Sequence, residues 1–187
     1  DAGSVFIFGG EALADGDYPV SDADLVLDGL ASSDRMGHAL LVTDVNCDDQ
    51  SDLVVSAKGE DGGQGNNQGV VRVFLGPVDL SAGTLLDTDA DYQLNGVEGS
   101  DRFGSSLASA GDIDGDGCDD LLIGAEQAGN YHSRGAAYLF YASRFCPDVT
   151  DPACATGIPI VFAADGADIV LSHPDVLGWA GTSVAGL

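Results

Sequence analysis

Basic residues are scarce in this sequence. Only six of its 187 residues are Lys or Arg, against 31 that are Asp or Glu, and the formal net charge is −25. Proteins bind nucleic acids and anionic membrane surfaces through clustered Lys and Arg, so this composition excludes both kinds of partner. No apolar run approaches the roughly 20 residues that a membrane-spanning helix needs, and we therefore expect no membrane insertion.

Catalytic patterns are also lacking. The three His residues are scattered, with neither the spacing of zinc ligands nor a nucleophile beside them. The sequence contains no nucleophile elbow, phosphate-binding loop or HExxH pattern. We therefore predict that this chain is not an enzyme.

Asp and Gly are abundant instead. Only four of the acidic residues are Glu, and Gly occurs 27 times. Both Asp and Gly favour turns and oxygen-rich metal loops over helix interiors. No helical periodicity of three or more turns is present. The composition therefore predicts an all-β protein of short strands joined by tight turns.

Three strand-like patterns recur along the chain. The pattern GSVFIF returns as GVVRVF and GAAYLF at intervals of 66 residues, and two others return at intervals of 67 and 77 residues. The three sets begin at Gly3, Gly69 and Gly135; at Ala23, Ala90 and Ala167; and at Gly37, Gly104 and Gly181. Because independent patterns share one period, we infer a structural repeat of about 67 residues.

Each full repeat contains four strand-like segments. One of them, DLVVSA or DLLIGA, is a continuous apolar run typical of a strand buried on both faces. A second segment, ADYQLNG or ADIVLSH, alternates polar and apolar residues, as a half-exposed strand does. This gradient predicts the four-stranded antiparallel blades of a β-propeller. The predicted boundaries are 1–30 for the end of a blade, 36–95 for a full blade, 103–172 for a second full blade with an insertion at 144–157, and 178–187 for the start of another.

These segments add up to an incomplete propeller of about three blades. A closed propeller needs at least about four blades, so the chain cannot close by itself. We expect either further blades in a longer protein or completion by neighbouring copies, because unpaired strand edges accept additional strands.

Two acidic loops have the composition of calcium sites. The segment DIDGDGCDD supplies carboxylates from Asp112, Asp114, Asp116 and Asp120, and we predict a further oxygen from the backbone carbonyl of Cys118. Gly117 supplies a positive φ for the sharp turn. The absence of a Glu at the twelfth position and of flanking helices argues against an EF-hand, and magnesium rarely uses such all-protein sites.

The upstream copy, DVNCDDQSD, has a similar set of oxygen donors. The predicted ligands are Asp44, Asn46, Asp48, Asp52 and the backbone carbonyl of Gln50. This loop has one carboxylate fewer, and Asp49 replaces the glycine of the turn. We therefore predict two Ca²⁺ sites, of which the upstream site binds more weakly.

Four cysteines are present. Cys146 and Cys154 bracket the Pro- and Asp-rich segment CPDVTDPAC, which predicts a local disulfide, with free thiols in a reducing compartment as the alternative. Cys47 and Cys118 occupy non-equivalent positions in the two acidic loops, and the sequence leaves their pairing open.

One repeat resembles a known family. Phe103-Gly104, the acidic loop from Asp112 to Asp120 and then Gly124-Ala125 together resemble an FG-GAP repeat of the integrin α-subunit β-propeller type. Glu126 departs from the pattern, because the family often has Pro there. The upstream copy, with Met36-Gly37, is looser. The resemblance implies a seven-bladed propeller in the parent protein, calcium in each acidic loop and an extracellular setting.

These observations favour an extracellular, calcium-binding β-propeller module in adhesion or structural assembly. The expected partner is a protein or glycan at the cell surface or in the matrix. Two alternatives remain open: a carbohydrate-binding propeller, and an accessory propeller of a secreted hydrolase or lyase whose catalytic groups lie elsewhere.

Overall fold

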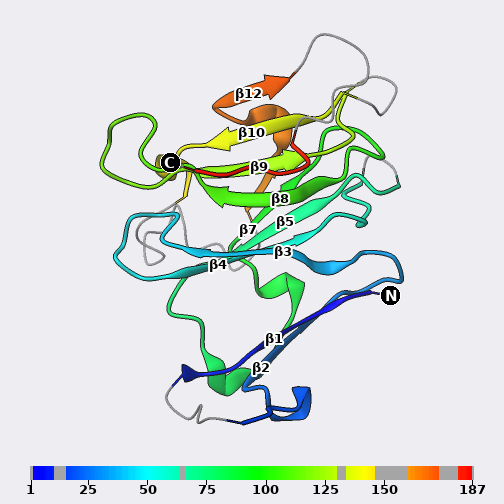
Figure 1. The fold of residues 1–187 in the computed structure, drawn as a ribbon, viewed down its shortest axis with the longest axis vertical. Coiled ribbons are helices and arrows are strands. Elements are labelled where there is room, and N and C mark those ends of the chain that lie inside the picture. The colour runs from blue at the N-terminus through cyan, green and yellow to red at the C-terminus, as the bar shows by residue number, and fades with distance from the viewer. Residues whose placement is uncertain are drawn as a thin grey trace.

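A computed structural model describes residues 2–10, 16–63, 66–129, 134–145, 160–172 and 181–186. These residues form three sheets that lie one above another, with the N-terminal sheet at the bottom of Figure 1 and the C-terminal sheet at the top. Single-turn 3-10 helices connect some of the strands. No helix in these ranges is long and apolar enough to cross a membrane. The predicted all-β class is confirmed.

Two of the sheets contain the predicted four antiparallel strands. In the middle sheet these are β3 (Met36–Thr43), β4 (Asp52–Ala57), β5 (Val70–Phe74) and β7 (Tyr92–Asn95). In the top sheet they are β8 (Phe103–Ser109), β9 (Leu121–Ala125), β10 (Ala136–Phe140) and β12 (Ile169–Ser172). The strand order is the same in both, so each sheet is a propeller blade built from one repeat.

The first sheet contains β1 (Ser4–Ile7) paired antiparallel with β2 (Leu25–Asp28). At the other end of the chain, residues 181–186 contain no assigned strand. They lie against the top blade, where the hydroxyls of Ser105 and Ser106 both donate to the carbonyl of Gly181, each at 2.9 Å. The predicted disulfide between Cys146 and Cys154 and most of the predicted 144–157 insertion lie outside the described residues.

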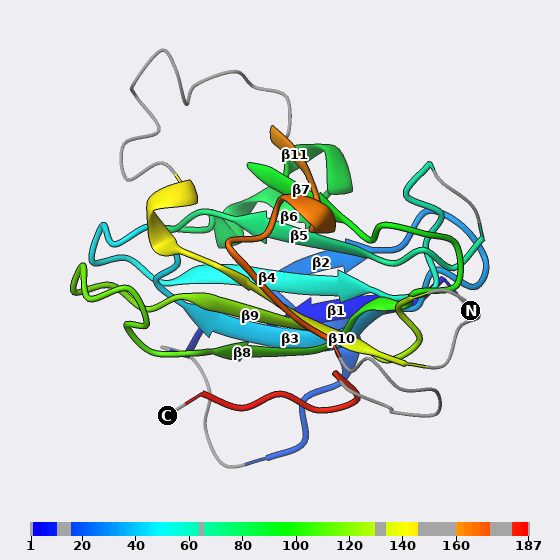
Figure 2. The ribbon, with the colours of Figure 1, turned by 90° about the horizontal axis from the view of Figure 1, so that it is seen from above.

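Two additional strands pair in parallel, which the sequence did not predict. β6 (Gly83–Leu85) adds to β2, and β11 (Ile160–Ala163) adds to β7 (Figure 2). Both belong to the connection between the last two strands of the following blade. This connection therefore crosses to the preceding blade and covers an outer edge that would otherwise expose unpaired backbone groups. The intervening 3-10 helices are η2 (Val20–Asp22), η3 (Leu80–Ala82), η4 (Asp87–Asp89), η5 (Ala142–Arg144) and η6 (Ala164–Gly166).

Strand β4 is buried along its whole length, as its apolar run predicts. Successive side chains of a strand point to opposite faces. Val54 accordingly packs in the core between the middle and top blades, whereas Leu53 and Val55 pack in the core between the first and middle blades. The central strands thus hold neighbouring blades together through two separate apolar cores.

An aspartate caps a strand end in every blade. Its carboxylate accepts a hydrogen bond from a backbone N–H just beyond β1, β5 or β10, at 2.6, 2.7 and 2.9 Å respectively. The three pairs are Asp24 with Gly9, Asp91 with Leu75, and Asp168 with Tyr141. This contact explains the recurring Ala-Asp pattern, because the aspartate satisfies a donor that the sheet leaves unpaired.

The caps differ in their electrostatic surroundings. Burial raises the pKa of Asp91, and the hydrogen bond from the N–H of Leu75 offsets this only in part. Burial acts in the same direction on Asp168, but the guanidinium of Arg144, 2.7 Å away, and the N–H of Tyr141 contribute to a net lowering of the pKa of Asp168. The same structural role is therefore filled by carboxyl groups of different acidity.

The Phe103-Gly104 pair lies where two blades meet. The Phe103 ring is fully buried, and its centroid lies 5.5 Å from that of Tyr138 in an edge-to-face arrangement. Gly104 has a φ of +82°, and a Cβ atom there would lie 2.7 Å from Cβ of Ser56 and 2.9 Å from Cγ2 of Val71. Only glycine fits this junction without moving the neighbouring blade.

We expect Gly104→Ala to destabilise the protein more than Gly83→Ala. Gly83 also has a positive φ, +72°, but no atom lies within 4 Å of its would-be Cβ. Both variants should lose about 1–2 kcal/mol from the left-handed backbone. The junction variant should lose about 1–3 kcal/mol more through overpacking. Urea unfolding measures both, and equal losses would show that the blades do not constrain this position.

Candidate metal centre

The two acidic loops are the turns between the first two strands of adjacent blades. One joins β3 to β4 and the other joins β8 to β9, and both lie on the left of Figure 1. Nine of the ten predicted ligand residues lie in these turns, and the tenth, Asp52, is the first residue of β4. Their role as metal ligands stays a prediction.

In the second loop, Asp112 shapes the turn. Its Oδ1 accepts a hydrogen bond from the N–H of Gly115 at 2.7 Å, and its Oδ2 accepts one from Gly117 at 2.9 Å. Both glycines have positive φ, +84° and +95°. The predicted conformation of Gly117 is therefore confirmed, and the turn curls around the carboxylate of its first residue.

Three exposed carboxylates of this turn lie close together. One oxygen each from Asp112, Asp114 and Asp116 can be chosen so that all three lie within 4.8 Å of one another, and all three residues are exposed. In the part of the chain that the structure describes, this is the one such group of three or more His, Cys, Asp or Glu residues. Partial desolvation, followed by repulsion from the neighbouring carboxylates of the loop, raises the pKa of Asp114. A bound divalent cation would relieve this repulsion.

Asp120 has a different position from the other three carboxylates. It is 1% exposed, and its two oxygens accept hydrogen bonds from the N–H groups of Ile113 at 2.9 Å and Ala142 at 3.0 Å. It therefore ties the loop to the residues that follow β10. Each carboxylate oxygen has a second lone pair, so this role is compatible with the predicted metal ligation.

The first loop repeats these contacts. Oδ2 of Asp44 accepts from the N–H of Asp49 at 2.9 Å, and Asp52 accepts from Val45 at 2.7 Å and from Gly76 at 2.8 Å. Burial raises the pKa of Asp52, in spite of these two donors. The amide of Asn46 donates to Asp48 at 3.1 Å. The two turns therefore have the same backbone design.

The backbone of the first loop is less favourable. Cys47 and Asp49 have φ values of +63° and +66°, at the positions that Gly115 and Gly117 occupy in the second loop. Non-glycine residues in this region cost about 1–2 kcal/mol each, although Asp is more tolerant than most. The left-handed conformation expected for Asp49 is confirmed, while that of Cys47 had no signal in the sequence.

Gln50 and Cys118, whose carbonyl oxygens are predicted metal ligands, lie at equivalent positions in the two loops. The N–H of Gln50 donates to Oδ1 of Asp48 at 2.8 Å, and the N–H of Cys118 donates to Oδ1 of Asp116 at 2.9 Å. In both loops, the residue at the seventh position is therefore attached to the carboxylate two residues earlier.

A disulfide joins the two loops. Cys47 and Cys118 are bonded, with their Cα atoms 5.6 Å apart, although they are 71 residues apart in the sequence. The sequence left this pairing open because the two positions are not equivalent in the repeat. The pairing follows from the tertiary structure, because the turns of two adjacent blades lie side by side.

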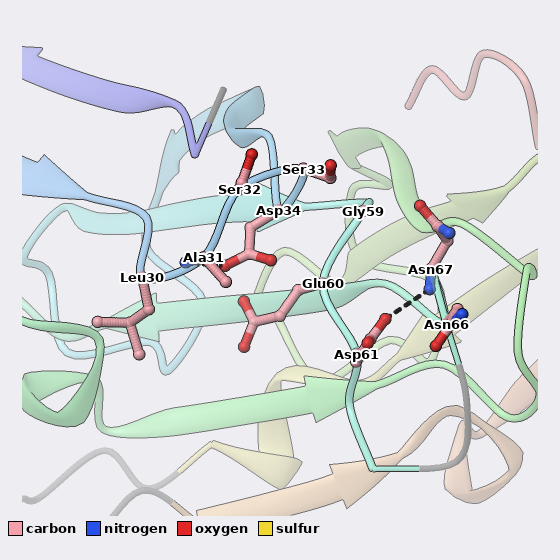
Figure 3. Close-up of a pocket in the computed structure, with 10 residues that line it drawn as sticks. All are labelled: Leu30, Ala31, Ser32, Ser33, Asp34, Gly59, Glu60, Asp61, Asn66 and Asn67. Atoms are coloured by element: carbon pink, nitrogen blue, oxygen red, sulfur yellow. Dashed lines mark hydrogen bonds between the residues drawn. The ribbon is translucent and has the colours of Figure 1, made fainter.

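A polar pocket of about 470 Å³ lies at the opposite end of the strands from these loops (Figure 3). Glu60 on its wall pairs with the buried Arg72 through two contacts of 2.6 and 2.7 Å. The carboxylate of Asp61 accepts from the N–H of Asn67 at 2.7 Å, and that of Asp34 accepts from Ala31 at 2.7 Å. Its acidic groups are thus engaged within the protein. The lining residues are Leu30, Ala31, Ser32, Ser33, Asp34, Gly59, Glu60, Asp61, Asn66 and Asn67.

Stacked four-stranded blades with an acidic turn between their first two strands define this chain as part of a β-propeller. The FG-GAP repeat model matches residues 36–74 and 103–140, so each match contains one of the acidic turns. The chain therefore contains two FG-GAP repeats, and the predicted resemblance is confirmed.

Proteins similar to this chain include a phospholipase D and integrin alpha subunits. The chain is 34% identical over 161 residues to phosphatidylinositol-glycan-specific phospholipase D of Rattus norvegicus, covering 75% of this chain and 18% of that protein. It is 36% identical over 106 residues to integrin alpha-5 of Xenopus laevis and 34% identical over 106 residues to integrin alpha-V of Gallus gallus. Each integrin match covers 56% of this chain and 10% of the integrin. The chain thus spans less than a fifth of the length of these relatives.

We expect substitutions of the buried Asp120 and of the exposed Asp114 to change the stability of the metal-free protein by different amounts. Asp120→Ala leaves two backbone donors without their acceptor and should cost about 2–4 kcal/mol. Asp114→Asn changes an exposed group and should stay within about 0.5 kcal/mol of the parent. Urea unfolding in excess chelator measures both. Similar losses in the two variants would contradict the separation between an anchoring and an exposed carboxylate.

Proposed function

We propose that this chain is a calcium-binding β-propeller module of an extracellular protein, acting in adhesion or structural assembly. The observation that carries the proposal is the exposed group of Asp112, Asp114 and Asp116. Three carboxylates on a turn already shaped by its own hydrogen bonds match the hard oxygen ligands that calcium prefers.

Each loop would hold one Ca²⁺ ion. In the second loop the ligands would be Asp112, Asp114, Asp116, Asp120 and the carbonyl of Cys118. In the first they would be Asp44, Asn46, Asp48, Asp52 and the carbonyl of Gln50. The first site should be the weaker one, because an amide replaces a carboxylate and two non-glycine residues occupy left-handed positions.

The extracellular location rests on two observations. The chain is similar to integrin alpha subunits, and a disulfide joins Cys47 to Cys118. Disulfides persist in oxidising environments and are rare in the cytosol. An extracellular medium also supplies calcium at the concentrations that weak sites need.

Calcium removal should lower the stability of the protein. A ligand that binds only the folded state at about 100 times its Kd contributes about 2.7 kcal/mol per site. We expect the melting temperature to fall on addition of chelator and to recover on addition of calcium. Asp112→Asn should remove more of this effect than Asp44→Asn, because the second loop is the stronger site. A melting temperature indifferent to chelator would contradict calcium binding.

A second candidate function is an accessory propeller of a secreted enzyme. The specific support is the similarity to phosphatidylinositol-glycan-specific phospholipase D, which extends over 75% of this chain. The activity would then belong to another part of the protein, and this chain would remain a calcium-binding module without catalytic groups. Enzyme assays of the full-length protein, with and without this module, distinguish the two candidates.

The first blade has an open edge that suits assembly. Within the described ranges, β1 pairs only with β2, and no strand pairs with its other edge. An apolar groove of about 360 Å³ lies beside it, bordered by Phe6 and Leu40 among others. Leu40 is 51% exposed, whereas Leu107, its equivalent in the next repeat, packs against the apolar core between blades. By analogy with the next repeat, we expect two further strands to pack in this groove.

We infer that strands of another FG-GAP repeat complete this edge, supplied by a second copy when the chain is alone in solution. We expect concentration-dependent oligomers in sedimentation velocity, which Leu40→Glu should dissociate. Leu30→Glu is the matched control, since Leu30 is 73% exposed but lines the polar pocket instead. A chain that is monomeric at all concentrations would contradict self-assembly.

A further inference from the structure

The disulfide is built into both candidate calcium loops. Cys47 is the fourth residue of the loop that begins at Asp44, and Cys118 is the seventh residue of the loop that begins at Asp112. The bond therefore crosses from one blade to the next and joins different positions of the two turns. Cys47 is exposed, so a small reductant in solution can reach the bond.

The loops that it joins carry charge of one sign. The segments 44–52 and 112–120 contain nine carboxylates and no Lys or Arg. Like charges brought together repel, and a bound divalent cation offsets this repulsion. Holding the two loops together is therefore least favourable when the cation is absent.

The bond is also attached directly to predicted ligands. The N–H of Cys118 donates to Oδ1 of Asp116, one of the three converging carboxylates. On the other side, Cys47 lies between Asn46 and Asp48, which are hydrogen-bonded to each other at 3.1 Å. A cross-link at these positions restricts the loop backbone before a cation binds, and so reduces the ordering entropy that binding would otherwise cost.

We propose that the disulfide between Cys47 and Cys118 sets the calcium affinity of the Asp112–Asp120 loop, and that bound calcium in turn protects the disulfide from reduction. This inference rests on the proposed calcium binding and adds a redox control to the same site. The two effects are one coupling free energy: if reduction weakens calcium binding by some factor, calcium opposes reduction by the same factor.

The redox step needs an external dithiol. One of its thiolates attacks a sulfur of the disulfide, which breaks the S–S bond, forms a mixed disulfide and releases one cysteine thiolate. The second thiol of the reagent then displaces the other cysteine and closes the reagent into a cyclic disulfide. Two electrons and two protons pass to the protein, and both cysteines end as thiols.

The first arm of the test measures calcium affinity by isothermal titration in the oxidised and dithiol-reduced protein. We expect reduction to weaken binding by about fivefold or more, within the usual range of coupling between sites. The double variant Cys47→Ser/Cys118→Ser should bind as weakly as the reduced protein and should not respond to dithiol. It retains Cys146 and Cys154, so it separates their contribution from that of the bond between the loops.

The second arm uses the unaltered chain and remains decisive even where the reduced form or the double variant unfolds. The fraction of protein reduced is measured in a dithiol buffer series, with and without calcium. We expect saturating calcium to shift the midpoint toward a more reducing buffer. Asp114→Asn should abolish the shift. Asp119→Asn, which removes a charge from the same loop but no predicted ligand, should retain it.

The outcomes separate the two proposals. Calcium binding of equal affinity in both redox states, or a midpoint that calcium does not move, would overturn the coupling and leave the proposed function intact. Failure of the oxidised protein to bind calcium at all would overturn the proposed function itself, and the coupling with it.

Discussion

Close contact between neighbouring blades is the constraint on which the rest of the structure depends. At Gly104, a single methyl group would collide with Ser56 and Val71 of the preceding blade. The adjacent Phe103 ring is fully buried in the apolar core that these two blades share. Because these contacts hold the blades face to face, equivalent turns of successive repeats lie next to one another at the same end of the stack.

This stacking gives the acidic loops their particular character. In each loop, the first and last aspartates accept hydrogen bonds from backbone N–H groups, and the last one also reaches the residues beyond the third strand. The loop is therefore shaped by protein contacts, while the remaining carboxylates stay exposed. Aspartates therefore have two roles in these loops, which differ in burial. Asp120 is almost fully buried and anchors the loop, whereas Asp114 is exposed.

The strand edges of the blades differ in whether another strand pairs with them. Parallel strands from the following repeat cover the outer edges of β2 and β7. The free edge of β1 has no such cover among the described residues, and exposed apolar side chains border the groove beside it. Strand edges covered by the next repeat along the chain make each blade dependent on its neighbour, as expected for a repeat protein.

Features that depend on local pattern can be predicted from the amino-acid sequence. The apolar run of β4, the turn at Gly117 and the four strands per blade follow from residues close together in the chain, and the repeat period follows from comparing copies of the same short patterns. The sequence also located the converging aspartates of the second loop, because their alternation within a short turn brings them together without help from the rest of the fold.

Features that join distant segments depend on how the blades pack and could not be predicted from the sequence. The parallel strands β6 and β11 have no distinctive composition, and their pairing depends on which edge the stacked blades leave open. The bond between Cys47 and Cys118 exists because two loops 71 residues apart occupy adjacent corners. The capping role of Asp24, Asp91 and Asp168 depends in the same way on a donor at the end of a paired strand. Sequence patterns record the preferences of neighbouring residues, whereas these contacts are set by how the blades pack against one another.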